Sequence, residues 1–194
     1  VLSLYKSGNL STLTEVLFIE RCLNLLKPGG RLGIVLPEGV LNNTNLQNVR
    51  ELFEGMAKII LITSIPQDVF MASGATVKPS LMFFKKFTKE EALQYEDAKT
   101  KAYDKIKEKY AEQITELKTL ELQIEQEVKP IIKQMFDYQI PIAQVEKAGI
   151  TSTGSQCENE LEELLVEYTK YREEHKLWES TPNYMEYKFE NGFL

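Results

Sequence analysis

The tripeptide Pro37-Glu38-Gly39, which comes directly after the apolar run Leu32–Leu36, is the part of the sequence best suited to chemistry. A short, continuous apolar run between turn residues predicts a strand that is covered by helices on both faces. In an open α/β sheet, ligands bind in the loops at the carboxyl ends of the strands. The tripeptide is therefore predicted to lie at the functional edge of a sheet. The alternative is that Pro37 and Gly39 only form the turn.

Alternating helix and strand patterns surround this tripeptide. A capping box at Thr12 and Glu15 predicts a helix with apolar residues at helical spacing, and Gly29-Gly30 predicts its end. A second capping box, Thr44 and Gln47, predicts the next helix. Its predicted apolar face consists of Leu46, Val49, Phe53 and Met56, and the buried strand Ala57–Ile65 comes next. Such alternation predicts neighbouring parallel strands joined by right-handed crossovers.

The segment Pro66–Lys78 contains no helical pattern, and the apolar segment Leu81–Phe87 comes after it. Because the connection lacks a crossover helix, this strand is predicted to run antiparallel to its neighbour. The fold class is thus α/β, a partial Rossmann-like sheet of parallel strands with one antiparallel strand. Residues 1–87 are predicted to form this part.

Residues 88–136 are rich in Lys and Glu and contain no glycine. Apolar residues recur every seven positions from Tyr103 to Ile131, which predicts a coiled-coil-like helix with one stripe in need of a partner. If unbroken, the helix spans about 70 Å at 1.5 Å per residue. The amphipathic segment Glu158–Glu174 is the predicted partner within the chain, although it is shorter.

Residues 137–194 form the third predicted part. An edge strand with Pro141 is expected in Tyr138–Val145, and a loop in Gly149–Ser155. The last residues, YMEYKFENGFL, alternate aromatic and polar residues, which predicts a strand. His175 and Trp178 are interpreted as a surface residue and a packing residue.

Composition excludes several functional classes. The 194 residues carry 23 Lys and Arg against 29 Asp and Glu, a net charge of −6, so no bulk positive field attracts nucleic acid or anionic lipid. The two cysteines, Cys22 and Cys157, fit no metal spacing, and Cys22 is expected to be a small buried hydrophobe. No apolar run is long enough to span a bilayer, so cytoplasm is the default compartment. The first residue is Val1, from which a fragment of a longer polypeptide is expected.

The segments KPGGRLGIVLPEGVL, ITSIPQDVF and SGATVKPSLMFFKK together resemble the modification subunits of type I restriction–modification systems, which are N6-adenine DNA methyltransferases. The later segment YQIPIAQVEKAGITSTG is similar to the region after the catalytic core in that family. The resemblance implies S-adenosyl-L-methionine as cofactor and flipped-out adenine as substrate. It also implies DNA, a specificity subunit and a restriction subunit as partners, with the helix 88–136 contributing to assembly.

The same resemblance identifies what is missing and what remains. The family's cofactor glycines and its Asn-Pro-Pro-aromatic catalytic motif do not occur in the chain, so methylation by this piece alone is not expected. The resemblance implies that the pocket for the flipped base is lined by Pro37, Glu38 and Gly39. It also implies that Phe70 stacks on the base and that Lys78 contacts a phosphate. The alternatives are a core role for Phe70 and a solvated surface role for Lys78.

Two other functions stay open from the sequence. The chain belongs to a class I methyltransferase that acts on a small molecule or a protein, or it is a non-catalytic scaffold kept for its coiled-coil arm. The residues encoded before Val1 would distinguish an adenine DNA methyltransferase from a methyltransferase for small molecules or proteins. A Pro-Pro-aromatic motif there would indicate adenine methylation.

Overall fold

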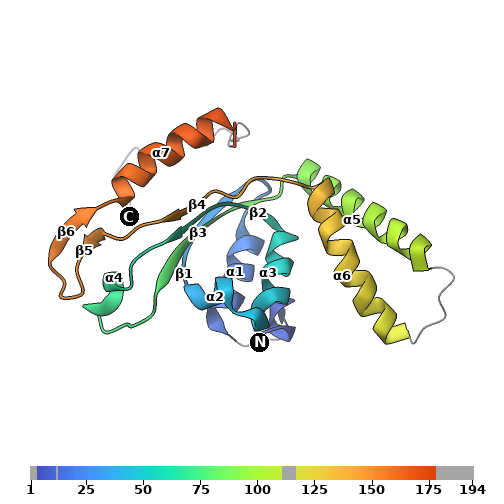
Figure 1. Cartoon of the computed structure of the whole chain (residues 1–194), viewed down its shortest axis with the longest axis horizontal. Coiled ribbons are helices and arrows are strands. Elements are labelled where there is room, and N and C mark those ends of the chain that lie inside the picture. The colour runs from blue at the N-terminus through green and yellow to red at the C-terminus, as the bar shows by residue number, and fades with distance from the viewer. Residues whose placement is uncertain (1–3, 12, 111–116, 178–194) are drawn as a thin grey trace, which may run out of the picture. The chain divides into compact units, whose positions relative to one another are not determined.

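The computed structural model describes residues 4–11, 13–110 and 117–177, whose helices and strands are drawn in Figure 1. The chain divides into two compact units, residues 1–64 with 78–143 and residues 65–77 with 144–194. The elements are α1 Thr14–Leu25, β1 Arg31–Pro37, α2 Glu38–Asn42, α3 Gln47–Glu54, β2 Ala57–Ser64, α4 Asp68–Met71, β3 Pro79–Lys86, α5 Lys89–Tyr110, α6 Leu117–Met135, β4 Ile142–Gln144, β5 Ala148–Ile150, β6 Gln156–Asn159 and α7 Leu161–Glu174, with short 3-10 helices at Ser7–Asn9 and Thr44–Leu46.

A mixed sheet with the strand order β1-β3-β2-β4 forms the centre of the first unit. The strand β3 is antiparallel to both β1 and β2, so β1 and β2 point the same way, as predicted. The prediction that these two strands are direct neighbours is wrong, because β3 lies between them. At the other side of β2, the carbonyl of Pro141 accepts a hydrogen bond from the Ile62 amide (3.1 Å), which confirms an edge strand in this segment. The mixed α/β fold class is confirmed.

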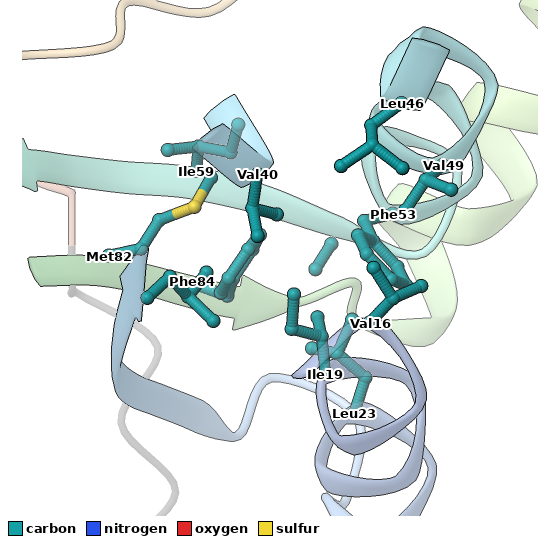
Figure 2. Close-up of a cluster of buried hydrophobic side chains, with 12 residues drawn as sticks. Val16, Ile19, Leu23, Val40, Leu46, Val49, Phe53, Ile59, Met82 and Phe84 are labelled. Atoms are coloured by element: carbon teal, nitrogen blue, oxygen red, sulfur yellow. The ribbon is translucent and has the colours of Figure 1, made fainter. Parts of the chain in front are cut away.

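The core of this unit lies between one face of the sheet and the helices α1 and α3 (Figure 2). Helical spacing gathers the apolar residues of each helix on the side that faces the sheet, as the sequence predicts. Alternate strand residues supply the other half of the core. The buried contributors include Val16, Ile19 and Leu23 from α1, Val49 and Phe53 from α3, and Leu36, Met82 and Phe84 from the strands.

The opposite face of β1 departs from the prediction. Within the described residues, Gly33 is exposed and Val35 keeps 48% of its surface accessible. The strand is therefore covered on one face only in this part of the chain, although its apolar run is continuous. A continuous run predicts burial on both faces only when a second layer is present, and residue type alone does not report that layer.

Of the two predicted helix starts, only the second is corrected. Thr12 lies outside the described residues, and α1 begins at Thr14 without a side-chain cap. Before α3, the side chain of Asn43 accepts a hydrogen bond from the Asn45 amide (2.9 Å), so the cap is Asn43 rather than Thr44. The helix α1 ends at Leu25, where Leu26 is already extended, and Gly29, with a φ of +76° that favours glycine, lies in the turn that follows.

Two helices, α5 and α6, pack against each other as a helical hairpin in the predicted helical arm, so the arm is not the single helix whose length was considered above. Both α5 and α6 contribute to a shared seam in which Ala102, Ile106 and Val128 are buried. At the far end of α5, the hydroxyl of Tyr110 and the ammonium of Lys109 (2.6 Å) both bond to Glu127 of α6. The apolar stripe therefore finds a partner within the same segment.

A cluster around Glu91 fixes the start of this hairpin to the sheet. Glu91 and Thr88 form a reciprocal capping box, with Thr88 N to Glu91 Oε2 at 2.9 Å and Glu91 N to Thr88 Oγ1 at 3.1 Å. The other carboxylate oxygen lies 2.9 Å from the ammonium of Lys58 and 3.3 Å from that of Lys85. These lysines are cross-strand partners on β2 and β3, so Glu91 separates two like charges that would otherwise repel.

In the second unit, β5 and β6 form an antiparallel hairpin, and the residues that connect them, 151–155, lie in the segment predicted as a loop. The carboxylate of Glu160 accepts hydrogen bonds from the amides of Glu146 (2.8 Å) and Lys147 (3.3 Å), which closes the hairpin onto the start of α7. The helix α4, in the segment predicted to lack helix, lies against β5. The predicted final strand and Trp178 lie outside the described residues.

Candidate functional site

Four of the five predicted site residues meet at the carboxyl end of β1. Pro37 ends the strand opposite Pro79 of β3, and β1 continues directly into α2. The amide of Glu38 donates to the carbonyl of Lys78 (3.0 Å), and the ammonium of Lys78 lies 3.4 Å from Glu38 Oε1. The register of β1 and β3 therefore brings together Pro37, Glu38, Gly39 and Lys78, although 40 positions separate Glu38 from Lys78.

The ion pair at this edge is open to solvent. The side chain of Glu38 is 33% exposed and that of Lys78 is 45% exposed. Exposed ion pairs contribute little to stability, because water and salt screen them. Both charged groups can therefore exchange this partner for a ligand at small cost.

The turn alternative fits Pro37 and does not fit Gly39. Pro37 has φ of −56°, close to the value that its ring imposes, so a role in the turn accounts for it. Gly39 is exposed and has no positive φ, and a Cβ atom built on it meets no atom of the described residues within 4 Å. Because glycine also lowers helix stability, the packing of this chain gives no reason for a glycine here.

Phe70 belongs to the second unit, where it lies on α4. It is 36% exposed, which does not favour the alternative of a core phenylalanine. Its carbonyl accepts hydrogen bonds from the amide (3.1 Å) and hydroxyl (2.8 Å) of Ser73, which fix the backbone behind the ring. An exposed aromatic ring on a fixed backbone can stack on a planar group.

Sequence reasoning missed two polar residues that hold the loops of the first unit. Glu20 is buried, and its two carboxylate oxygens accept hydrogen bonds from the amides of Lys6 (3.0 Å) and Ser7 (2.7 Å). Burial alone would raise the pKa of Glu20, but the hydrogen bonds from Ser7 and Lys6 hold that pKa below its usual value. An acidic residue on the apolar face of α1, between Ile19 and Leu23, is the signal that could have identified it.

Arg50, on α3, is the second such residue. Its Nη1 atom donates to the carbonyls of Val40 (3.1 Å) and Asn43 (2.8 Å) at the end of α2. No periodicity in the sequence points to this contact, because an arginine on the polar side of a helix is ordinary.

A cavity of about 480 Å³ lies between α3 and the helical hairpin. Its aromatic wall, formed by Tyr95, Phe136 and Tyr138, is near the start of β2, where the Ile59 amide donates to the hydroxyl of Tyr138 (3.3 Å). Burial raises the pKa of Tyr95 and that of Tyr138, so both hydroxyls stay neutral at physiological pH. None of the predicted site residues lines this cavity, and the pairs Lys129–Glu51 (2.8 Å) and Lys133–Glu54 (3.4 Å) tie α6 to α3 beside it.

Other kinds of site were sought in the described ranges. No group of three or more metal-ligating side chains occurs in residues 4–11, 13–110 and 117–177. His175 is exposed and stacks on Tyr171, as expected of a surface residue, and Cys22 is a partly buried free thiol. No helix in these ranges has the length and apolarity needed to cross a membrane.

Comparison with protein families tests the resemblance stated from the sequence. The family model described as N-6 DNA Methylase matches residues 8–152. This range includes the sheet, the helical hairpin and the edge formed by Pro37, Glu38, Gly39 and Lys78, here called the site edge. The chain belongs to the N-6 DNA methylase family. The resemblance stated from the sequence is therefore confirmed at the level of this family, and a methyltransferase fold is the setting of the site edge. A search of curated proteins found no match.

Two solved structures are similar to this N-6 DNA methylase chain. One is described as a class I S-adenosylmethionine-dependent methyltransferase from Listeria monocytogenes, with 21% identity and a TM-score of 0.40 over 45% of this chain and 27% of that chain. The other comes from a study of complex assembly in a type I R-M system, with 17% identity and a TM-score of 0.36 over 87% of this chain and 39% of that chain. The chain thus spans well under half of either protein, and TM-scores this low add no weight to the family assignment.

Proposed function

We propose that this chain is part of a site-specific DNA adenine-N6 methyltransferase, the modification subunit of a type I restriction–modification system. The match to the N-6 DNA methylase family over residues 8–152 carries the proposal. The type I assignment is supported by the sequence resemblance of the segments around Pro37, Ile65 and Lys78. The substrate is adenine flipped out of duplex DNA, with the specificity and restriction subunits as partners.

The edge formed by Pro37, Glu38, Gly39 and Lys78 lines the DNA side of the active site in this proposal. A flipped base needs a pocket with room for its ring, and the open space at Gly39 supports that role. The Lys78 ammonium, 3.4 Å from a solvent-exposed carboxylate, can move to a DNA phosphate without leaving a buried charge behind. Phe70, exposed on α4, is the candidate to stack on the base or its neighbour.

The cofactor of the full protein is S-adenosyl-L-methionine, which supplies the methyl group. The turn at this edge, from β1 into α2, does not fit that cofactor. The strand-to-helix turn from β1 into α2 contains Pro37 and Glu38 and no glycine with positive φ, so it cannot form the glycine-rich cradle. The described glycines with positive φ lie elsewhere, in turns at Gly29, Gly74 and Gly154 and within β5 at Gly149.

The test is methyl transfer by the full-length polypeptide assembled with its partner subunits. Labelled S-adenosyl-L-methionine and duplex DNA are supplied, and the nucleosides are separated after digestion. The proposal predicts label in N6-methyladenine. Label in a protein or in a small molecule would support a different class I methyltransferase, and no label in any acceptor would support a non-catalytic scaffold.

A further inference from the structure

The segment that carries the site edge is too short to hold its own conformation. The helix α2 has only five residues, and a single short 3-10 turn separates it from α3. Helices of this length are not stable alone, because nucleation costs more than one turn of hydrogen bonds returns. The position of Glu38 and Gly39 therefore depends on contacts that other elements make with α2.

At its first residue, α2 is attached to β3. The Glu38 amide donates to the Lys78 carbonyl (3.0 Å), and the side chains of these two residues are paired. This contact is part of the site edge itself. It leaves the other end of the helix to be fixed.

At its last residues, α2 is attached to α3 by Arg50. The last carbonyls of a helix have no partner within the helix. The guanidinium Nη1 of Arg50 donates to two carbonyls, those of Val40 (3.1 Å) and Asn43 (2.8 Å). The side chains of Val40 and Leu46 are only 4% and 6% exposed, so they also hold this segment against the core.

We infer that Arg50 is a positioning residue for adenine methylation. It acts through α2, because its hydrogen bonds reach the end of the helix opposite Glu38, and it holds Glu38 and Gly39 where the base enters. The inference rests on the proposed function and deepens it. A lysine can supply charge at this position, but its single ammonium lacks the rigid planar geometry of the guanidinium, so it replaces arginine only in part.

The experiment compares four full-length proteins assembled with their partner subunits: wild type, Arg50→Gln, Arg50→Lys and the control Asn48→Ala. Asn48 is exposed on the same helix. Steady-state methylation of duplex DNA is measured well below the unfolding midpoint of every variant. Because displacement of a positioned group by about 1 Å can cost about 100-fold in rate, kcat is expected to fall about 10- to 100-fold in Arg50→Gln. The KM for S-adenosyl-L-methionine is expected to stay unchanged, Arg50→Lys to be intermediate, and Asn48→Ala to match wild type.

Hydrogen–deuterium exchange of the peptide covering residues 37–46 provides a second readout that does not require activity. Arg50→Gln is expected to speed exchange there, with the peptides of β1 and β3 unchanged. A wild-type kcat in Arg50→Gln, or unchanged exchange of that peptide, would overturn the inference while leaving the proposed function intact. Absence of adenine methylation by the wild-type protein would overturn the proposed function, and with it the role of Arg50 in that reaction.

Discussion

Replacement of Glu91 by Gln tests how the helical hairpin is fixed to the sheet. The carboxylate serves three partners: Lys58 at 2.9 Å, Lys85 at 3.3 Å and the Thr88 amide at 2.9 Å. The glutamine keeps the shape of the side chain and removes its charge. It thereby leaves two cross-strand lysines facing each other without a counter-charge.

The expected loss depends on exposure. Hydrogen bonds to charged groups contribute about 1.5–3 kcal/mol each in favourable cases. The Lys58 side chain is 26% exposed and Glu91 is 14% exposed, so water screens part of this contribution. After that discount, the free energy of unfolding should fall by about 1–2 kcal/mol. For a protein of this size the unfolding midpoint then falls by about 2–8 °C.

The effect should also depend on pH. Burial works to raise the pKa of Glu91, but the Thr88 hydrogen bond and the neighbouring Lys58 and Lys85 bring that pKa below its ordinary value of 4.5. A carboxylate with a lowered pKa stabilises the folded state above its unfolded pKa, and this contribution is lost as the pH falls through the folded pKa. The difference between wild type and Glu91→Gln should therefore be constant near neutral pH and shrink below about pH 4.5.

The assay is urea unfolding followed by circular dichroism at 222 nm, at several pH values. Glu96→Gln is the matched control, because Glu96 lies on the same helix and is exposed. The control should stay within about 0.5 kcal/mol of wild type. Equal stability of Glu91→Gln and Glu96→Gln at pH 7, or a difference that grows in acid, would refute the reasoning.

Three further predictions test other parts of the structure. Ala102→Leu should destabilise the chain by about 1–3 kcal/mol in urea unfolding, because Ala102 is fully buried in the α5–α6 seam; equal stability would contradict that seam. Lys78→Gln in the full-length protein should reduce the slope of log K for DNA against log salt by about 1, and an unchanged slope would exclude a phosphate contact. Phe70→Ala should weaken binding of duplex DNA by about 1–3 kcal/mol if the ring stacks on a base, whereas Met71→Ala, exposed on the same short helix, should bind like wild type; matching losses in both variants would argue against stacking.

Much of the first unit was predictable from local patterns. Helical spacing predicts the apolar faces of α1 and α3, and the absence of a crossover helix predicts the antiparallel direction of β3. The insertion of β3 between β1 and β2 was not predictable from these patterns, because strand order depends on long-range pairing. The same holds for the hairpin of α5 and α6, since heptad spacing predicts that a stripe needs a partner without identifying it.

The candidate site was predictable in its residues and only partly in its geometry. The place of Pro37, Glu38 and Gly39 directly after a strand indicates them, and the register of β1 with β3 then places Lys78 beside Glu38. Arg50 was missed, because it donates hydrogen bonds to backbone carbonyls, and no sequence pattern reveals such contacts. Phe70 was assigned to the core as one alternative, since residue type alone favours burial of phenylalanine.

Nucleoside mass spectrometry of genomic DNA tests the central claim most directly. A host that lacks adenine methylation expresses the full-length protein with its partner subunits as wild type, as Gly39→Leu, or as Asn42→Leu, the control at the other end of α2. The account predicts N6-methyladenine with the wild type and with Asn42→Leu, and a large loss with Gly39→Leu at unchanged protein stability. Absence of N6-methyladenine with the wild type, or equal amounts with Gly39→Leu, would contradict it.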